Sequence, residues 1–397
     1  MVKFLDLELE MFGIDVSDSA VKVLKLKKKR KFFEVDFLDE VEIEPGIVDA
    51  GVIKNEDALA KIIRKSIISK VAGKLKTKYA VVALPEEKSF LDVIQMPMMK
   101  EEELQSAVLF QAENYIPMSL DQVYLDFQIV DYNEKKHDHL DVLIVAMPKT
   151  TVDSYLSCFK KVGLVPVVLE VESQAIARAL VKNESSSVPL ILINYGKKNS
   201  NIIIFSGQSI KFTSSIPISS SQITEAIAKG LSVSLEEAEK IKVNFSLFKK
   251  DESEESKKIY NAIYPVLNDL IFQIKKYLIF YKDHASHDHS LNGKDVALNI
   301  SQLENDKENV EDNKATNSIG DIFNFNGQEK IIITGGGSNL KGLAEFISKE
   351  ISIETEIGNV FSNLVLKNNN LIREEKKSSF CTAIGLALRA VNNKKYD

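Results

Sequence analysis

The sequence predicts an α/β fold, and three pieces of the 397-residue chain carry this prediction. Residues Phe12–Leu26 form a strand pattern, an Asp-rich polar turn and a second strand pattern. Residues Leu190–Phe205 repeat that form, with the turn at Asn194–Ser200. In Lys330–Leu343 an apolar β-branched strand ends at Thr334, three glycines follow, and an amphipathic helix is expected to begin near Asn339.

The glycine loop is the part of the chain best suited to bind a nucleotide. Consecutive glycines let a backbone pass beneath a flat ligand that any Cβ would hinder. A helix start adds backbone N–H groups and a favourable dipole. In the first hairpin, Lys22 lies seven residues after Asp15. A tight turn can therefore bring the Lys22 ammonium group back over the phosphates of a nucleotide bound at that turn. The alternative is that the glycines only change the chain direction.

Composition describes an ordinary folded protein, with 44% apolar residues and a net charge of −6, and it argues against binding nucleic acid. The one basic run, Lys25–Lys31, falls at an expected hairpin turn and is either solvated or a contact for anionic lipid or a partner. Only Cys158 and Cys381 are present, which implies no disulfide framework and predicts a reducing compartment. No signal peptide is apparent, and no apolar run approaches the roughly 18–20 residues that span a bilayer. We therefore expect a cytoplasmic protein whose membrane association is through a partner.

The remaining elements follow in order. Further patterns predict the helix Asn55–Val71, the buried strand Ala80–Leu84, and a small unit with its own core made of Phe90–Gln95, Lys100–Asn114, Val123–Val130 and Leu140–Ala146. Next come the helix Lys149–Val162, the strand Val165–Val171, and the helices Glu172–Leu180, Ser219–Gly230, one capped by Ser234, and Ile259–Tyr281. A polar tract at 284–328 is expected to be a mobile surface insertion, and the chain then continues as Leu340–Glu350, Ile351–Ile357 and Ser378–Asn392.

Several motifs together resemble the PilM family of type IV pilus assembly proteins, which are actin-like ATPases related to the cell-division protein FtsA. The motifs are Asp15–Lys22, Pro45–Asp49, Glu113–Pro117 with Leu125–Gln128, Leu235–Lys242, Thr334–Ser338 and Ala383–Arg389. The resemblance covers nearly the whole chain. It implies an α/β actin-like (ribonuclease H-like) fold of two lobes, with an extra small α+β subdomain in the first lobe.

The resemblance also implies domain boundaries. The first lobe would comprise residues 1–88 and 149–189, with the FtsA-like subdomain inserted at 89–148. The second lobe would comprise 190–377, including the insertion at about 284–328. The C-terminal helix, 378–397, would return between the lobes.

By the same resemblance, ATP would bind between the lobes. The nucleotide-binding residues would be Asp15, Ser17, Asp18, Ser19, Lys22, Asn194, Gly196, Glu239, Lys242, Gly335, Gly336, Gly337 and Ser338. Asp15 and Asn194 would hold Mg2+ through water, since hard oxygen ligands suit that ion. Glu172, or Gln174 in its place, would face the attacking water, unless Glu172 only complements the dipole of its helix. Glu239 and Lys242 could instead pair with each other.

The chain departs from the family pattern at three places. Asn194 replaces the second aspartate and loses its charge, Ser17 replaces a glycine in the first turn, and Ser219–Ser220 replaces a glycine pair. These changes affect turnover more than binding, so we expect a nucleotide-binding scaffold whose ATP hydrolysis is weak or absent.

The resemblance implies one main partner, the cytoplasmic N-terminal tail of the inner-membrane protein PilN, held in a groove beside the inserted subdomain. Met96, Met98 and Met99 could line this groove, or they could fill the small core. Other pilus assembly proteins at the inner face of the cytoplasmic membrane, and a homo-oligomer, are further expected partners. The alternatives are a filament-forming actin-like cytoskeletal ATPase related to FtsA, and an enzyme such as a true ATPase or a sugar or acetate kinase.

Overall fold

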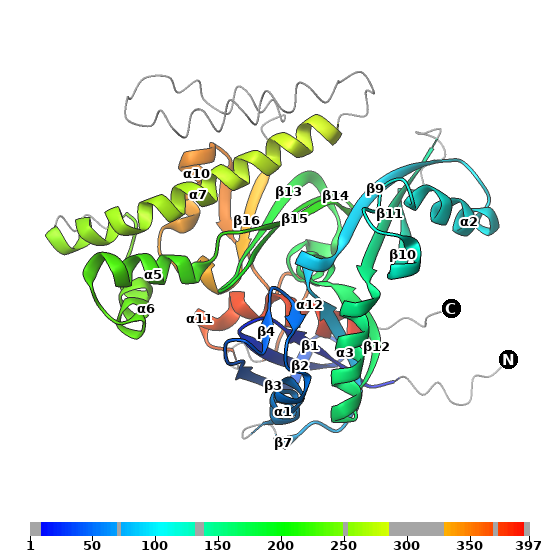
Figure 1. Cartoon of the computed structure of the whole chain (residues 1–397), viewed down its shortest axis with the longest axis horizontal. Coiled ribbons are helices and arrows are strands. Elements are labelled where there is room, and N and C mark those ends of the chain that lie inside the picture. Colours follow the sequence, from blue (N-terminus) through cyan, green and yellow to red (C-terminus); the bar gives the residue numbers. More distant parts are fainter. Residues whose placement is uncertain are drawn as a thin grey trace. The chain divides into compact units, whose positions relative to one another are not determined.

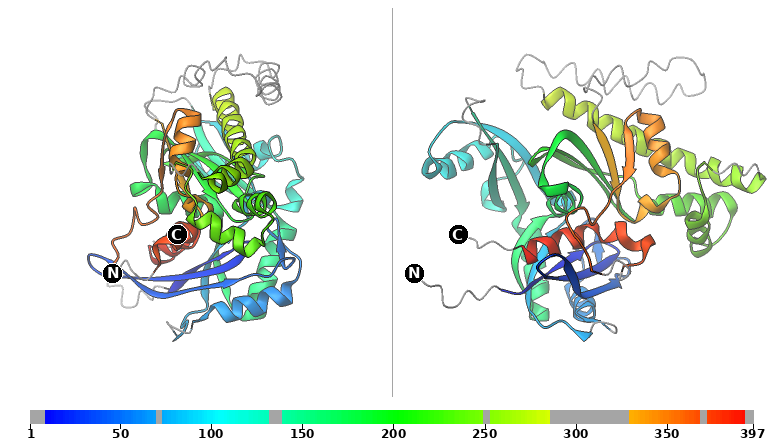
Figure 2. Two further views of the ribbon diagram at one scale, coloured as in Figure 1. Left: turned by 90° about the vertical axis from the view of Figure 1, so that its left-hand side faces the viewer. Right: turned by 180° about the vertical axis from the view of Figure 1, so that it is seen from behind.

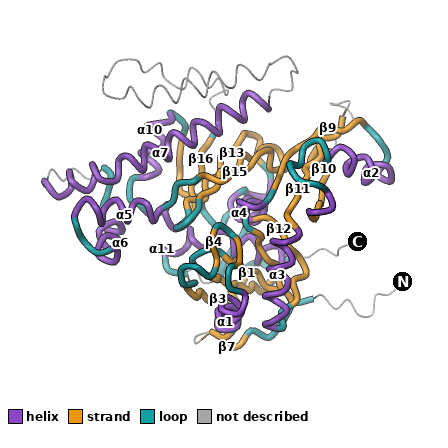
Figure 3. Tube along the Cα trace, in the orientation of Figure 1, coloured by secondary structure: helices purple, strands orange, loops and turns teal. Residues whose placement is uncertain are grey.

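A computed structural model describes residues 9–69, 73–131, 139–248, 253–285, 329–367 and 372–392 (Figure 1). The chain divides into two compact units. Unit 1 comprises Met1–Ser187, Phe205–Thr213 and Asn359–Asp397, and unit 2 comprises Val188–Ile204 and Ser214–Gly358. Strands and helices alternate through both, as an α/β fold requires (Figure 3).

The central sheet of unit 1 has five strands in the order β12-β8-β1-β2-β3. β1 pairs antiparallel with β2, and β2 with β3, whereas β1, β8 and β12 run parallel. The strands are β1 (Met11–Val16), β2 (Ala20–Lys28), β3 (Phe33–Glu42), β8 (Tyr79–Leu84) and β12 (Val165–Val171).

A second five-stranded sheet has the order β15-β14-β13-β16-β17. β13, β16 and β17 are parallel. The two sheets therefore have the same strand order. In each, three consecutive strands lie side by side, as β3-β2-β1 and as β15-β14-β13. Two strands parallel to the last of these follow, β8 and β12 in the first sheet and β16 and β17 in the second. The strands are β13 (Ser186–Tyr195), β14 (Ser200–Gly207), β15 (Ser209–Ile216), β16 (Lys330–Thr334) and β17 (Glu354–Ile357). This repetition agrees with the two hairpins of like form in the sequence.

Alternating side chains cover both faces of the sheet in unit 1. Phe12 and Ile14 pack into one core with α1 (Glu56–Ser66) and α3 (Lys149–Val162). Met11 of the same strand belongs to a second core, on the other face. That core is closed by α4 (Glu172–Leu180) and α12 (Cys381–Val391).

Helix α12 lies unusually close to its neighbours because two glycines omit a side chain. A Cβ placed on Gly13 of β1 would lie 2.6 Å from the backbone nitrogen of Ala387 in α12. A Cβ placed on Gly385 of α12 would overlap the backbone of Ala175 in α4. The C-terminal helix, expected between the lobes, thus makes its closest contacts with β1 and α4 of unit 1.

The inserted segment has the core of its own that the sequence predicts. It consists of β9 (Phe90–Pro97), α2 (Glu101–Ala112), β10 (Val123–Asp131) and β11 (His139–Pro148). The strands form an antiparallel sheet in the order β10-β11-β9, so β10 is an edge strand. Leu104 and Val108 of α2 pack against this sheet.

In unit 2, α5 (Ser220–Leu231) packs on α6 (Leu235–Asn244) and on α7 (Glu254–Ala285). Both short helices begin where the sequence predicts, because Ser219 forms a capping box and Ser234 accepts the N–H of Glu237. The polar insertion expected at about 284–328 lies outside the described residues from position 286 onward.

Several expected boundaries are wrong by a few residues. The helix after the glycines begins at Leu343 (α10, Leu343–Ile351), because Gly336–Asn339 form a 3-10 turn. Ser352 then adopts a left-handed conformation, which delays β17 to Glu354. The remaining short elements are β4 (Val48–Asp49), β5 (Val52–Ile53), β6 (Ile68–Ser69), β7 (Gly73–Lys74), α11 (Glu374–Lys377) and the 3-10 turns Glu86–Lys88, Leu120–Gln122, Lys182–Glu184 and Ser378–Phe380.

Among the helices of the described residues, none combines the length and apolar character needed to cross a bilayer.

Candidate functional site

The first predicted phosphate turn joins β1 to β2 in unit 1. Asp15 and Lys22 are direct cross-strand partners, so their side chains share one face of the sheet. Asp15 is only 4% exposed. Burial raises the pKa of its carboxyl group, the positive charge of Lys22 lowers it, and the negative charge of Glu40 raises it further. A cation bound nearby would favour the charged form of Asp15.

Ser17 occupies the inside of this turn. Its Oγ accepts hydrogen bonds from the backbone N–H groups of Ala20, at 3.2 Å, and Ser19, at 3.4 Å, and donates to the Ala20 carbonyl at 3.1 Å. The N–H of Ser17 also donates to that carbonyl. Amides that a phosphate group would need are therefore already bonded within the turn.

Asp18 has a structural role. Its carboxylate oxygens accept the backbone N–H groups of Ala50 at 2.7 Å and Gly51 at 3.0 Å. These bonds tie the phosphate turn to the small β4–β5 hairpin. The assignment of Asp18 as a nucleotide ligand stays a prediction. It would require one carboxylate both to hold the β4–β5 hairpin and to contact the nucleotide.

Glu172 is the first residue of α4, where its charge suits the helix dipole. It lies near the phosphate turn, as the environment of Tyr155 shows. Burial raises the pKa of Tyr155 well above its usual value, and the charges of Glu172, Asp18 and Asp15 raise it further. The charges of these carboxylates thus act on one buried phenol, whose hydroxyl donates to the Gly51 carbonyl at 3.3 Å.

In unit 2 the glycine loop packs against the second phosphate turn. Gly335 has a φ of +86°, and a Cβ there would lie 2.5 Å from the Tyr195 carbonyl oxygen. A Cβ on Gly337 would overlap the ring of Tyr195. Both glycines are buried, whereas Gly336 between them is exposed. Two of the glycines are therefore explained by packing, and Gly336 is the one open to a ligand.

The same region gathers other predicted residues. A Cβ on Gly335 would also meet Oδ1 of Asn194 at 2.6 Å, so the loop and that side chain are adjacent. The N–H of Ser220, at the start of α5, donates to the Gly196 carbonyl at 3.0 Å. Ser338 Oγ donates to the Gly335 carbonyl at 2.8 Å. The second turn, the start of α5 and the glycine loop form one cluster.

Glu239 and Lys242 of α6 pair with each other, the alternative that their spacing left open. Their ion pair measures 2.7 Å, and both bond Thr224 of α5, at 2.6 and 2.8 Å. Burial alone would raise the pKa of Glu239, but the bonds from Lys242 and Thr224 outweigh it and hold the pKa below its usual value. Lys197 in the second turn lowers it further, so this pair borders the cluster.

No group of three or more His, Cys, Asp or Glu side chains suited to hold a metal directly occurs in the part of the chain that the structure describes. The expectation that Asp15 and Asn194 hold Mg2+ through water stays a prediction. Asp15 would supply a buried carboxylate and Asn194 an amide oxygen, both hard donors.

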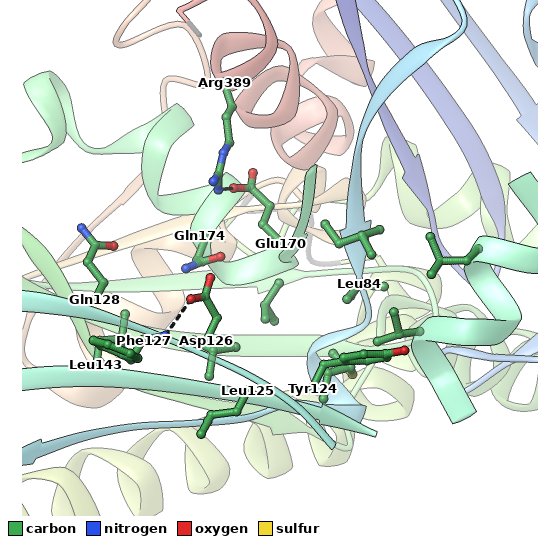
Figure 4. A pocket seen from close by; sticks show the side chains of 16 residues that line it. Leu84, Tyr124, Leu125, Asp126, Phe127, Gln128, Leu143, Glu170, Gln174 and Arg389 are labelled. Carbon is green, nitrogen blue, oxygen red and sulfur yellow. Dashed lines mark hydrogen bonds and ion pairs between the residues drawn. The ribbon is translucent and has the colours of Figure 1, made fainter. Parts of the chain in front are cut away.

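A groove of about 520 Å3 lies beside the inserted subdomain, entirely within unit 1 (Figure 4). Its apolar part includes Leu84, Val145 and Leu156, and its polar part includes Gln174 and Arg389. Gln174, the alternative to Glu172, therefore faces this groove. The complete lining is Leu84, Tyr124, Leu125, Asp126, Phe127, Gln128, Leu143, Val145, Met147, Val152, Leu156, Leu169, Glu170, Val171, Gln174 and Arg389.

The groove is bordered by β10, an edge strand of the subdomain sheet. Five consecutive residues of that strand, Tyr124–Gln128, line it. Tyr124, Asp126 and Gln128 share one face of the sheet with their cross-strand partners in β11, Met147, Val145 and Leu143, which also line the groove. The groove therefore covers this face of the sheet and reaches its β10 edge. The N–H of Phe127 donates to the Asp126 carboxylate at 2.9 Å, so this backbone donor already has a hydrogen-bond partner.

A buried ion network forms one end of the groove. Glu170 is 1% exposed at its side chain and accepts two hydrogen bonds from Arg178, at 2.6 and 2.9 Å. Arg389 pairs with the same carboxylate, and its side chain is 32% exposed. Figure 4 shows Arg389 and Glu170 in contact at this end of the groove. Arg389 is therefore the cation that a ligand can reach.

The predicted methionines do not line this groove. Met96 is 1% exposed and belongs to the core of the subdomain, Met99 packs against that core, and Met98 is 39% exposed on the surface. Met96 therefore follows the alternative expectation, that these methionines fill the small core of the subdomain. The motif Leu125–Gln128 contained the edge residues instead, and an edge strand could not be recognised without the strand order.

Comparisons with known proteins identify the family and the fold of this chain. The sequence model of the family described as "Type IV pilus assembly protein PilM" matches residues 13–311 and 324–391. A solved PilM-PilN type IV pilus biogenesis complex is similar with a TM-score of 0.74 and 23% identity, over 97% of this chain and 100% of that chain. The ethanolamine utilization protein EutJ from Carboxydothermus hydrogenoformans is similar with a TM-score of 0.50 and 14% identity, over 95% and 88%. The expected actin-like fold is thereby confirmed, and this chain belongs to the PilM family of type IV pilus assembly proteins.

Proposed function

We propose that this protein is a type IV pilus assembly scaffold whose groove binds the cytoplasmic N-terminal tail of a PilN-like inner-membrane protein. The observation that carries the proposal is the groove along β10, which fits an extended chain. The solved complex of PilM with PilN is its second support. The protein would act at the inner face of the cytoplasmic membrane, attached through this partner, and would contact other pilus assembly proteins and copies of itself.

The chemistry of the groove suits a peptide better than a small metabolite. The β10 edge offers backbone donors and acceptors to an added strand, which gives affinity with little dependence on sequence. The apolar wall then selects bulky aliphatic side chains, and Arg389 at the polar end selects a carbonyl or carboxylate. A peptide strand would compete with Asp126 for the N–H of Phe127.

The candidate nucleotide residues support a second part of the proposal. ATP would bind to the phosphate turns of the two units and the glycine loop, with Mg2+ near Asp15 and Asn194. Asp15 with Lys22, and exposed Gly336 beside Asn194, are the features suited to phosphate and cation. The binding of a single nucleotide to all of these residues stays a prediction.

Turnover would be weak or absent. Ser17 already binds the amides of Ser19 and Ala20, and Asn194 lacks a charge. Glu172 remains the group that would orient a water molecule. Nucleotide binding would favour one closure of the lobes and so bias the groove, with α4 contributing to both places through Glu172 and Gln174.

Calorimetric titration with a peptide from the PilN N-terminus tests the main proposal. Val145 is half-buried in the groove wall, so Val145→Arg should abolish binding by placing a charged chain there. Val165→Arg is the matched control, because Val165 is 40% exposed and does not line the groove. Equal affinities for the two variants would exclude this groove as the peptide site.

The nucleotide proposal has a separate test. Titration with ATP and Mg2+ should show binding, whereas multiple-turnover phosphate release should be slow or undetectable. Sustained release would contradict the scaffold, and nucleotide-dependent sedimentation would favour the filament-forming alternative.

A further inference from the structure

The turn between β2 and β3 carries a dense positive charge that the proposed function does not use. Lys27, Lys28, Lys29, Arg30 and Lys31 follow one another, and all are exposed. The turn is ordered by a hydrogen bond from the Lys29 N–H to the Phe32 carbonyl at 2.9 Å. Figure 2 (left) shows the blue hairpin extending away from the rest of the unit 1 sheet. We call this feature the basic tip.

A second segment extends the basic tip. The N–H of Phe33 donates to the Val365 carbonyl at 2.8 Å, and the N–H of Lys367 donates to the Phe33 carbonyl at 3.1 Å. This pairing brings the Lys367 ammonium to 5.7 Å from the centre of the Phe32 ring. It also presents Val365, which is 67% exposed, beside the cations. The tip thus combines positive charge with an exposed aliphatic side chain.

Among the described residues, little of this charge is neutralised locally. Glu34 pairs with Lys29 at 3.7 Å and with Lys367 at 3.3 Å. Asp36 and Glu10 are occupied by Lys25, at 2.8 and 2.7 Å. Since the whole chain has a net charge of −6, a concentration of cations at one turn is not explained by composition.

The tip lies next to one end of the peptide groove. Lys28 Nζ donates to Oδ1 of Asn392 at 3.3 Å. Asn392 follows the last residue of α12, one turn beyond Arg389, which lines the groove. A tail that enters the groove at Arg389 would therefore place the tip close to the membrane in which that partner is anchored.

We propose that the basic tip binds the anionic headgroups of a lipid bilayer. This inference rests on the proposed function for its geometry, and it adds a direct contact to attachment through the partner. Each Lys or Arg near an anionic surface contributes about 1 kcal/mol, and the attraction falls within about one Debye length. Val365 and Phe32 suit the boundary between headgroups and acyl chains. Two weak contacts held together would give the complex a longer residence at the membrane than either alone.

Vesicle sedimentation with the full chain tests the inference. The probes are phosphatidylcholine vesicles and vesicles that also contain phosphatidylglycerol. The triple variant Lys29→Glu, Arg30→Glu, Lys31→Glu should lose at least about a hundredfold in binding to anionic vesicles, which is the value for removing the three positive charges alone, before the repulsion of the added carboxylates. The control Lys229→Glu, Lys258→Glu, Lys349→Glu makes the same change in net charge at exposed helix positions of unit 2 and should bind like the wild type.

The outcomes separate this inference from the proposed function. Binding that falls with added salt, requires anionic lipid and is lost only in the tip variant supports it. Equal losses in both triple variants, or no binding of the wild type, would overturn it. Peptide titration without vesicles should be unaffected by the tip variant. If peptide affinity falls instead while vesicle binding persists, the tip recognises the partner protein and the lipid proposal is wrong. Lys29→Ser, Arg30→Ser, Lys31→Ser repeats the test should charge reversal prevent folding.

Discussion

The backbone of Gly385 lies directly against the carbonyl of Ala175, with no room for a methyl group between them. Through this contact α12 is fixed to α4, and through Gly13 it is fixed to β1. Each of the three elements has one end near a candidate site: β1 ends after Asp15, α4 begins at Glu172, and α12 ends two residues after Arg389. A displacement of α12 should therefore disturb the groove as well as the fold.

Replacing Gly385 with Ala should destabilise the protein. The added methyl group overlaps main-chain atoms, which cannot rotate away, so an overpacking cost of about 1–3 kcal/mol should exceed the gain in helix propensity. Thermal unfolding followed by circular dichroism measures the effect. Gly230→Ala in α5 is the comparison and should cost less stability, because its methyl group would lie 2.7 Å from the Ala262 Cβ, whereas that of Gly385→Ala would overlap the Ala175 carbonyl oxygen. Equal stabilities of the two variants would contradict the described packing.

Replacing Ser17 with Gly should tighten ATP binding by about tenfold. The change removes the hydroxyl that holds the N–H groups of Ser19 and Ala20, and amides that bond a charged phosphate contribute about 1.5–3 kcal/mol each before the cost of a more flexible turn. Titration calorimetry with ATP and Mg2+ gives the affinity.

The variant Ser17→Ala separates the two causes in that experiment, since it frees the same amides but keeps the Cβ. Its affinity should lie between those of wild type and Ser17→Gly. Ser19→Gly loosens the turn without removing the Ser17 hydroxyl and should not tighten binding. A rise in affinity with Ser19→Gly alone would show that flexibility, not the freed amides, is responsible.

Replacing Glu86 with Gln should stabilise the protein at neutral pH. Glu86 is 4% exposed, and burial raises the pKa of its carboxyl group despite the hydrogen bonds from Thr213 and Ser173 that lower it. A carboxyl whose folded pKa exceeds its unfolded value binds more protons when folded, so stability falls as pH rises between the two values. The neutral amide avoids that cost while its oxygen can still accept the Ser173 N–H at 3.1 Å.

Thermal unfolding measured from acidic to neutral pH checks the Glu86 prediction. The wild type should fall behind Glu86→Gln as pH rises through the raised pKa, and the two should converge at low pH, where Glu86 is protonated. A wild type that gains on Glu86→Gln as pH rises would reverse the assigned sign.

Much of the fold follows from local patterns in the sequence. The helices Lys149–Val162 and Glu172–Leu180 and the strand between them have the predicted bounds, because Gly163 stops one helix and each apolar pattern is unbroken. The helix after the glycine loop does not, since Lys341 pairs with Ser246, nearly a hundred residues earlier. Such a long-range contact leaves no local pattern.

The candidate site shows the same division. The hairpin pattern was sufficient to place Asp15 opposite Lys22. The bond between Asp18 and the β4–β5 hairpin depends on tertiary structure, as does the burial of Met96. Methionine is common both in cores and at binding surfaces, so its type alone could not decide between them. A groove beside the subdomain was expected, but its β10 lining was missed for a related reason, because an edge strand is defined by the absence of a neighbour.

The two arginines on Glu170 should separate stability from peptide binding. Arg178 makes two bonds to the buried carboxylate and is 15% exposed at its side chain, so Arg178→Gln should cost about 3–5 kcal/mol. Arg389→Gln leaves those bonds in place and should cost much less.

Because Arg389 lines the groove and Arg178 does not, only Arg389→Gln should weaken PilN-peptide binding strongly at a temperature where both variants are folded, by about tenfold. Chemical unfolding and calorimetry on the same preparations measure the two effects. If the peptide affinity of Arg389→Gln matched that of wild type, the polar end of the groove would have no part in recognising the tail, and the peptide would have to be held by the β10 edge and the apolar wall alone.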